Sequence, residues 1–378
     1  MSTRTSIEWT DVTWNPIRGC SMVNAACTNC YAMRQAHRFS GLGQPYEGLT
    51  RLGPNGPVWT GKVVFDERKL LEPLGWRKPR AIFVNSMSDL FHESLTDEQI
   101  DRVFAVMALC PQHTFQVLTK RPARMVEYVG LQHRNLRLGN AAFQVDGKRA
   151  MKLLHQREND GTCRAYWPMP NVWLGGSVEN QPTADERVPH LLRLAGLGWN
   201  VLVSYEPALG PVDFSAIKQD LGNGLFGDAL RWSHMPYEGG EERPYPHIGC
   251  IIAGGESGPG ARPSHPDWFR STRDKCAAAG VSFFFKQWGE WGPCETFHLP
   301  DVRHGFAPIP MVRTQKGEEI YAGSVWSTGP SGRVRHTSFI DREPKGTAGG
   351  YVARVGKKAA GRLLDGREHN DLPWRAGG

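Results

Sequence analysis

Short apolar runs recur along the sequence, and most of them lead through a few polar residues into a stretch with helical periodicity. Several runs are apolar without interruption, as strands are when both faces of a parallel sheet are covered. The runs occupy residues 63–65, 81–86, 114–119, 172–178, 200–207, 250–256 and 281–288. Helical patterns at 96–110, 184–198 and 265–280 fall between them. This alternation predicts an α/β fold, namely a parallel (β/α) barrel of the TIM type, either partial or full.

Two interruptions and a long C-terminal stretch break the alternation. Residues 131–170 are polar and mixed, and residues 211–247 are rich in Gly, Pro and Trp, so we expect both to be insertions. Residues 297–378 have little periodicity and much Gly and Pro, which predicts a basic, irregular extension after a barrel over residues 1–296. The 378-residue chain is 40% hydrophobic, which excludes wholesale disorder.

The sequence contains no stretch of eighteen consecutive apolar residues, so we expect neither a membrane-spanning helix nor a membrane partner. The opening residues, MSTRTSIEWTDVTWNP, carry acids early and lack the apolar segment of a secretory signal. A cytoplasmic protein is therefore expected.

Polar residues follow the carboxyl ends of six of the apolar runs. In a parallel barrel these ends converge at one mouth, where the active site forms. Six ends with the same pattern favour an enzyme, although such residue types also cap helices and form turns. The residues are Ser86, Ser88, Asp89, Lys120, Arg121, Ser177, Glu179, Asn180, Glu206, Glu256, Lys286 and Gln287.

The formal net charge is +7, and residues 301–378 contribute 13 Lys and Arg against 8 Asp and Glu. The segment 354–362 carries Lys357, Lys358 and Arg362 together with Arg354, and no acid lies between them. Such a basic tail suits a nucleic-acid partner, and a solvated surface explains it equally well. We retain both interpretations.

Three of the eight cysteines, Cys20, Cys27 and Cys30, form the pattern C-x6-C-x2-C before a helical stretch. A disulfide framework is typical of small secreted domains rather than of a chain this long. A structural zinc takes four ligands, and here only His37 could complete the set, without a second cysteine pair. A [4Fe–4S] cluster on three thiolates fits better, and it leaves one iron free to bind a small molecule.

The run from Asn15 to Cys20, N-P-x-R-G-C, and the closing C-x-x-C-Y-A resemble the cluster loop of radical S-adenosylmethionine enzymes, in particular the spore photoproduct lyase-like branch. Residues 83–107, 116–122 and 174–214 resemble later segments of that branch in the same order. The whole chain resembles more closely a phage-associated three-cysteine family of undefined substrate. Two departures are evident. Most members have C-x3-C-x2-C, and the G-G-E after their second strand is absent here.

The resemblance implies an enzyme that uses S-adenosyl-L-methionine and the cluster to generate a 5′-deoxyadenosyl radical. A flavodoxin or ferredoxin would supply the electron, and a nucleic acid would be the substrate of a DNA repair or modification reaction. The iron ligands would be Cys20, Cys27 and Cys30. We expect Ser88 and Asp89 to meet the methionyl amine or ribose in place of the missing motif. The other expected cofactor contacts are Lys120 at the carboxylate, Ser177 and Asn180 at the ribose, and Glu206.

A second interpretation stays open at this point: a non-catalytic nucleic-acid-binding protein whose iron–sulfur or zinc site is structural. The basic tail, with Lys357, Lys358 and Arg362, supports it, and so do the thirteen Trp residues, because aromatic rings stack on bases. It leaves the polar strand ends unexplained. The sequence assigns no catalytic residue under either interpretation.

Overall fold

The computed structural model describes most of the chain. The described residues are 5–131, 134–159, 167–218, 226–231, 234–236, 242–244, 246–298, 310–314, 319–321, 325–328, 334–336 and 351–375. Among these residues, none of the helices is both long and apolar enough to cross a bilayer.

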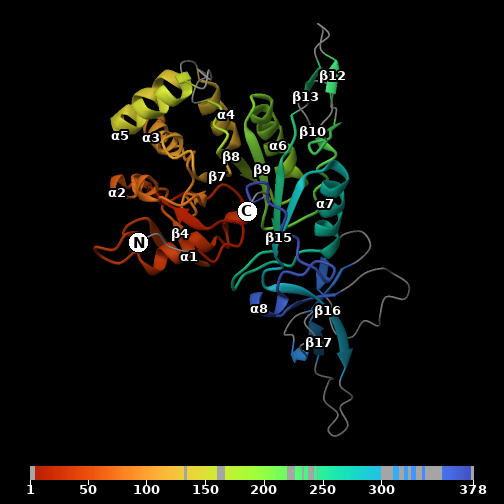
Figure 1. Ribbon diagram of the computed structural model, residues 1–378. Helices are drawn as coiled ribbons and strands as arrows, with labels where there is room; N and C mark the ends of the chain where they lie inside the picture. Colours follow the sequence, from red (N-terminus) through yellow and green to blue (C-terminus); the bar gives the residue numbers. More distant parts are fainter. Residues whose placement is uncertain are drawn as a thin grey trace.

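Seven parallel strands form one curled sheet, a half-barrel (Figure 1). Each strand pairs with the next one of the sheet along the chain, so the spatial order equals the sequence order. The strands are β1 (Val12–Trp14), β6 (Ala81–Val84), β7 (Thr114–Thr119), β8 (Val172–Ser177), β9 (Asn200–Tyr205), β14 (Cys250–Gly254) and β15 (Ser282–Gln287). The predicted partial TIM-type barrel is confirmed.

Helices cover the outer face of the sheet (Figure 1). Thr96 begins α3 with a capping box, its side chain bonded to the Gln99 N–H and the Gln99 side chain bonded back to Thr96. Gly280, at φ +70°, ends α7. The helices are α3 (Asp97–Ala108), α4 (Pro122–Gly130), α5 (Arg134–Asn159, kinked at Asp146), α6 (Gln181–Gly196) and α7 (Pro266–Ala279).

A long excursion separates β1 from β6 and carries the cysteine loop. It consists of small elements that pack beside the first strand rather than in the main sheet. The expected strand at 63–65 belongs here, because β5 pairs with β2 and not with the half-barrel. The elements are β2 (Ile17–Arg18), the 3-10 helix η1 (Ala25–Cys27), α1 (Tyr31–Arg38), β3 (Thr50–Gly53), β4 (Gly56–Trp59), β5 (Val64–Phe65), α2 (Glu67–Leu70) and η2 (Glu72–Gly75).

The two faces of the sheet are buried by different parts of the chain. Side chains such as Phe283 and Phe285 belong to the core beneath the helices, whereas Phe284 points to the opposite, concave face. There it joins Trp9 and Leu372 in a separate apolar cluster. The indole N–H of Trp374 donates to the Trp9 carbonyl at 3.1 Å. The two ends of the described chain therefore meet on the concave face.

The C-terminal extension contains more regular structure than its sequence predicts. Six antiparallel strands form a second sheet, and β16 runs across the expected boundary at residues 296 and 297. Short strands without a helical partner give a weak periodic signal, which explains the difference. In spatial order the strands are β18 (Glu319–Tyr321), β17 (Pro310–Thr314), β16 (Trp291–His298), β21 (Tyr351–Arg354), β19 (Val325–Thr328) and β20 (Val334–His336); α8 (Lys357–Ala360) follows.

The two expected insertions also have structure. Part of 131–170 forms α5, and 211–247 contributes two small antiparallel pairs between β9 and β14. These pairs are β10 (Ile217–Lys218) with β11 (Phe226–Gly227), and β12 (His234–Pro236) with β13 (Glu242–Pro244). The division of the chain at residue 296 stays a prediction.

Candidate functional site

The cysteine loop connects β1 to α1 and therefore lies at the carboxyl end of the first strand of the half-barrel. Cys20, Cys27 and Cys30 all line one cavity of about 440 Å³. The same cavity is lined by residues that follow β6 and β7 and by residues at the ends of β8, β9 and β15. The structure thus brings the three cysteines and the polar strand ends together at one mouth.

The backbone of the loop allows little variation at two positions. Gly19 has φ +91°, and a Cβ there would lie 2.2 Å from the carbonyl oxygen of Lys62, so only glycine fits before Cys20. Asn24 caps η1, because its Oδ1 accepts from the Ala26 N–H at 3.1 Å. The same Oδ1 lies 3.9 Å from the Sγ of Cys27. The conformation of the loop is therefore fixed next to two of the three thiols.

Two basic residues that follow β7 hold the loop from opposite sides. Arg121 donates from Nη2 to the hydroxyl of Ser21, the neighbour of Cys20, at 2.6 Å. Lys120 forms an ion pair with Glu179, whose Oε2 accepts from Nδ2 of Asn24 at 2.9 Å. The dipeptide Lys120–Arg121 therefore ties the part of the loop between Cys20 and Cys27 to the sheet, directly at Ser21 and through Glu179 at Asn24.

Asp89 lines the cavity, but its carboxylate is bonded within the protein. Oδ1 accepts from the Thr119 hydroxyl at 2.7 Å and from the Phe91 N–H at 2.9 Å. Oδ2 accepts from Nη1 of Arg121 at 3.0 Å and from the Lys120 N–H at 3.1 Å. With four donors on two oxygens, Asp89 organises the segment after β7 and has little capacity left for a ligand.

The other expected cofactor residues fall into two groups. Ser88, Lys120, Ser177 and Glu206 line the cavity. Asn180 is not among the lining residues; its side chain accepts from the Thr183 N–H at 3.1 Å and caps α6. Ser88 donates from its hydroxyl to the Ile17 carbonyl at 2.9 Å, so it also anchors the chain that leads into the cysteine loop.

Three of the carboxylates around the cavity are paired with cations. Glu179 and Arg187 are each 1% exposed and lie 3.2 Å apart. Lys286 donates to both oxygens of Glu206, at 2.9 and 3.0 Å. The carboxylate of Glu256 accepts two hydrogen bonds from the guanidinium group of Arg262, one from Nε at 2.8 Å and one from Nη2 at 2.6 Å. These three carboxylates are therefore neutralised, whereas Oε2 of Glu8, another lining residue, has no hydrogen-bond partner in the described structure.

Burial favours the protonated form of two of the three thiols, those of Cys20 and Cys30. Burial, followed by the charge of Asp89, raises the pKa of Cys20 to about 12. Burial also raises the pKa of Cys30, although the N–H groups of Met33 and Ala32 in the first turn of α1 oppose that shift. Because thiolates are the ligands of metals, binding of iron must displace these protons.

The three cysteines share one cavity without gathering as tightly as the ligands of a single metal ion do. Among the described residues, no three His, Cys, Asp or Glu side chains gather as the ligands of one ion do. A [4Fe–4S] cluster needs a wider arrangement, since each thiolate binds a different iron atom. Cys30 is in electrostatic range of both Cys20 and Cys27 around the shared cavity. His37, the possible fourth zinc ligand, instead has its Nδ1 3.0 Å from the hydroxyl of Thr50.

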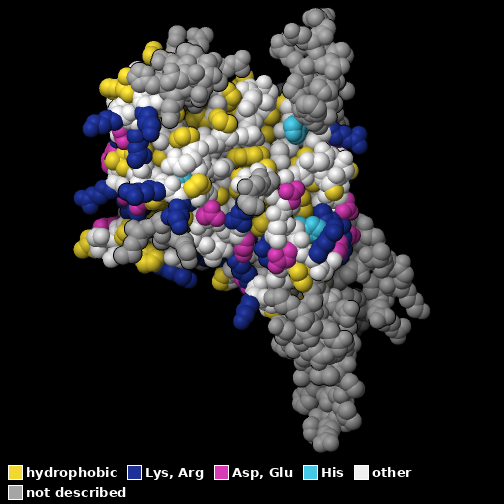
Figure 2. Space-filling view, viewed as in Figure 1, with side chains coloured by type: hydrophobic (Ala, Val, Ile, Leu, Met, Phe, Trp, Pro, Cys, Tyr) yellow, Lys and Arg dark blue, Asp and Glu magenta, His cyan; other side chains and the backbone are white. Residues whose placement is uncertain are grey.

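The predicted nucleic-acid residues of the tail do not form one group. Lys357 is exposed and lines the cavity. Arg362 instead lies over the ring of Phe284, 5.0 Å from its centroid, and 3.5 Å from a carboxylate oxygen of Glu368. Lys358 is exposed and is not among the cavity residues. On the face shown in Figure 2, Lys and Arg are interspersed with Asp and Glu rather than gathered in one patch.

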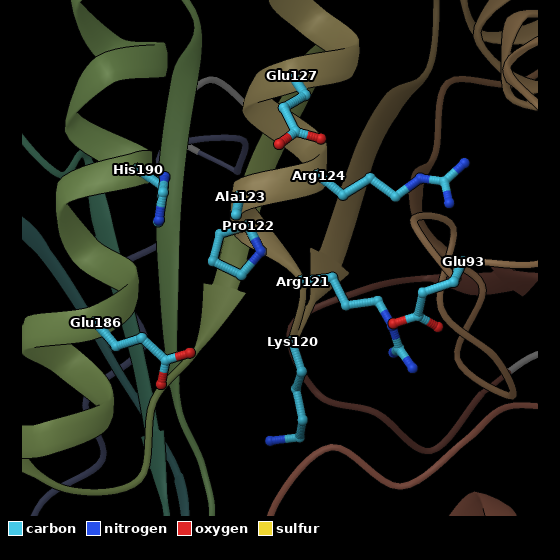
Figure 3. A pocket seen from close by; sticks show the side chains of 9 residues that line it. All are labelled: Glu93, Lys120, Arg121, Pro122, Ala123, Arg124, Glu127, Glu186 and His190. Carbon is cyan, nitrogen blue, oxygen red and sulfur yellow. The ribbon is translucent and has the colours of Figure 1, made fainter.

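A second cavity of about 400 Å³ lies between α4 and α6 (Figure 3). It shares Lys120 and Arg121 with the first cavity, so these side chains separate the two. Figure 3 shows Arg121 directed toward Glu93, and Nε of Arg121 lies 2.6 Å from that carboxylate. The other lining residues are Pro122, Ala123, Arg124, Glu127, Glu186 and His190.

Sequence reasoning did not assign Ser21 or Asn24 to the site, and it named Glu179 only as one of the polar strand ends, without a role. Ser21 and Asn24 could have been identified as candidates from the sequence, because both lie between Cys20 and Cys27. Their partners, Arg121 and Glu179, are 100 and 155 positions away. Only the fold shows those pairings.

A profile of the family described as "Protein of unknown function (DUF5131)" matches residues 4–373. No curated protein sequence matches the chain. Two solved structures show similarity. One is a spore photoproduct lyase mutant with bound AdoMet and dinucleoside spore photoproduct, at 11% identity and a TM-score of 0.31, covering 55% of this chain and 48% of the other. The other is spore photoproduct lyase complexed with dinucleoside spore photoproduct, at 9% identity and a TM-score of 0.34, covering 85% and 72%. The chain thus spans about half the length of the first.

Proposed function

The chain belongs to the DUF5131 family of proteins of unknown function, and we propose that it is a radical S-adenosylmethionine enzyme with a three-cysteine [4Fe–4S] cluster. One observation carries the proposal. The loop after the first strand of a parallel half-barrel places Cys20, Cys27 and Cys30 in the same cavity as the polar ends of the other strands. An active site of a parallel barrel forms at this edge.

When bound, the cluster and S-adenosyl-L-methionine supply one-electron cleavage of the sulfonium group, which yields a 5′-deoxyadenosyl radical. Cys20, Cys27 and Cys30 would hold the cluster through their thiolates. Asn24 and Arg121 keep the loop in place, through η1 and through Ser21. In the cavity wall, Glu206 and Glu256 are already paired with Lys286 and Arg262, so these two carboxylates can be kept from water without becoming unpaired buried charges.

The side chains that line the cavity are assigned to the cofactor: Ser88, Lys120, Ser177 and Glu206. The ammonium group of Lys120 would face the carboxylate of S-adenosylmethionine while it stays paired with Glu179. We assign Asp89 and Asn180 a positioning role instead, because their side-chain atoms are bonded to Arg121 and to the first turn of α6.

We further propose that the substrate is a nucleic acid or a component of one, and that the reaction is a repair or modification. The net charge of +7 supports this, and so does the exposed Lys357 at the cavity. A small acidic electron carrier such as a flavodoxin or ferredoxin is the proposed source of the electron.

Anaerobic reconstitution with iron and sulfide tests the proposal. The wild type should bind about four iron and four sulfide per chain and give a brown protein. Once reduced, it should convert S-adenosylmethionine to methionine and 5′-deoxyadenosine. Substituting Ala for any one of Cys20, Cys27 or Cys30 should abolish the absorbance, and Cys276→Ala, on α7 away from the cavity, should retain it. A colourless protein with stoichiometric zinc on the three thiols would contradict the proposal.

A further inference from the structure

Part of the cavity wall holds buried polar atoms that lack partners. Asn85 is 2% exposed and lines the cavity, yet neither its Nδ2 nor its Oδ1 has a hydrogen bond in the described structure. Oε1 of Gln287, Nε1 of Trp9 and Oε2 of Glu8, which belong to three further lining residues, also lack partners. Buried amide groups are normally bonded, because an unmade hydrogen bond is costly. A set of unpaired atoms around one cavity points to a ligand.

Asn85 is held in position by its backbone rather than by its side chain. Its φ is +58°, a left-handed conformation that Asn adopts more readily than most residues. Its N–H donates to the Trp14 carbonyl at 2.8 Å, and its carbonyl accepts from the Ser88 N–H at 3.2 Å. The end of β6 therefore fixes the carboxamide in the cavity wall, with one donor and one acceptor group available.

The neighbours of this carboxamide are aromatic. Phe83, on β6, and Asn85, directly after that strand, both line the cavity. The rings of Phe83 and Trp9 lie 4.7 Å apart between centroids at 54°, and both residues line the cavity. Aromatic faces beside neutral amides suit a planar, uncharged ring that carries its own donors and acceptors.

We propose that Asn85, with Gln287 and the rings of Trp9 and Phe83, binds the edge of a nucleobase. A carboxamide offers one donor and one acceptor side by side, which matches the adjacent acceptor and donor of a base. The base has two possible sources, the adenine of S-adenosylmethionine and a base of the nucleic-acid substrate. This inference deepens the proposed function and rests on it, because both possible sources of the base, the cofactor and the substrate, are taken from that function.

The test measures binding of thymidine, deoxyguanosine and S-adenosylmethionine to the full-length, cluster-loaded protein by equilibrium dialysis. Asn85→Gly removes the amide and keeps the left-handed backbone, and Asn85→Asp keeps the shape but loses the donor. Gln116→Met is the matched control, because Gln116 is a fully buried amide with an unpaired Nε2 that does not line the cavity. Thermal unfolding establishes that each variant is folded.

Both Asn85 variants should weaken binding of at least one probe by about 5- to 150-fold, the effect of one bidentate amide–base pair, and Gln116→Met should not. Weaker nucleoside binding alone assigns the site to the substrate base, and weaker S-adenosylmethionine binding alone assigns it to the adenine of the cofactor. Unchanged binding of all probes, or an equal loss in Gln116→Met, overturns the inference.

Iron content is measured on the same samples, so that the two proposals fail separately. A protein that carries the cluster and cleaves S-adenosylmethionine while Asn85→Gly binds every probe normally would overturn only the nucleobase site. A protein that binds nucleosides through Asn85 but assembles no cluster would overturn the proposed function and leave the nucleobase site in place.

Discussion

Nδ2 of Asn24 donates to Oε2 of Glu179 at 2.9 Å across 155 positions of sequence. The first residue belongs to the cysteine loop, and the second follows β8 and is 1% exposed. Glu179 also pairs with Arg187 and Lys120. The conformation of the loop beside Cys27 therefore depends on a buried ion-pair network in the body of the half-barrel.

Replacing Glu179 should destabilise the protein and loosen the loop together. Glu179→Gln leaves the buried guanidinium of Arg187 with only the exposed Glu186, 4.0 Å away, as a counter-charge, so the cost should approach the roughly 3–5 kcal/mol of a broken buried ion pair. We expect a lower midpoint in urea denaturation and faster loss of iron to a chelator. Asn24→Ala should accelerate iron loss too, but it removes only a cap and should cost about 1 kcal/mol. Equal unfolding midpoints for Glu179→Gln and the wild type would contradict the network.

Asp89→Ala should reduce the iron content rather than the affinity for S-adenosylmethionine alone. The carboxylate neutralises Arg121, whose guanidinium bonds Ser21 beside Cys20. Removing it leaves the exposed Glu93 as the remaining carboxylate paired with Arg121 and frees one end of the loop, so the cost should be below the roughly 3–5 kcal/mol of a fully unpaired buried charge. Iron per chain and thermal unfolding are the measurements. Wild-type iron content combined with weaker cofactor binding would instead make Asp89 a cofactor contact.

Lys120→Ala should weaken the binding of S-adenosylmethionine by about tenfold or more while the iron content is retained, because one charge-assisted contact is lost. The loop should stay in place, since Arg187 still neutralises Glu179. Equilibrium dialysis on reconstituted protein gives the affinity, and Lys275→Ala serves as a control cation that pairs with Asp213 outside the cavity. An iron-free Lys120→Ala protein would show that the residue is structural.

Cluster retention should rise steeply with pH. The pKa of Cys20 is raised to about 12 and that of Cys30 is also raised, so near neutral pH each ligand loses a proton when iron binds. Apparent affinity then increases about tenfold per pH unit for each proton released. Competition with a chelator at pH 7, 7.5 and 8 measures the slope. Retention that is independent of pH would mean that the thiols are already ionised.

Lys357 should contribute to salt-dependent binding of nucleic acid more than Arg362 does. Lys357 is exposed beside the cavity, whereas Arg362 packs on Phe284 and lies near Glu368. Each phosphate contact adds about −0.9 to the log–log slope on duplex DNA. We expect Lys357→Gln to flatten the slope by about one unit and Arg362→Gln to leave it nearly unchanged. Nucleic-acid titrations at several salt concentrations measure the slope for each variant. Identical slopes for wild type and Lys357→Gln would show that the tail does not take part in binding.

Much of the half-barrel could be predicted from the sequence, because six of its strands are apolar runs bounded by polar ends. The first strand, Val12–Trp14, could not, since three residues give no period and its pairing with Ile82–Val84 is long-range. The cysteines were evident from their spacing. The role of Asp89 was not, because a residue at a strand end reveals its position but not the partners that saturate it, here Thr119 and Arg121.

The unpaired amide of Asn85 is also invisible in the sequence. The sequence shows that Asn85 follows an apolar run. Whether its side-chain amide has a hydrogen-bond partner depends on every residue that the fold places around it. A residue can therefore be assigned to a strand end from sequence, whereas its free hydrogen-bonding groups become known only from the structure.

The hydrogen bond between Trp374 and Trp9 can form only after residue 374 has been synthesised. The cysteine loop leaves the ribosome early, more than three hundred residues before Trp374. Until Trp374 emerges, the concave side of the half-barrel lacks the segment that packs on Trp9 and Trp173. A nascent chain therefore presents its thiols on an unfinished scaffold, and delivery of iron and sulfur before release would meet a more open site than delivery afterwards.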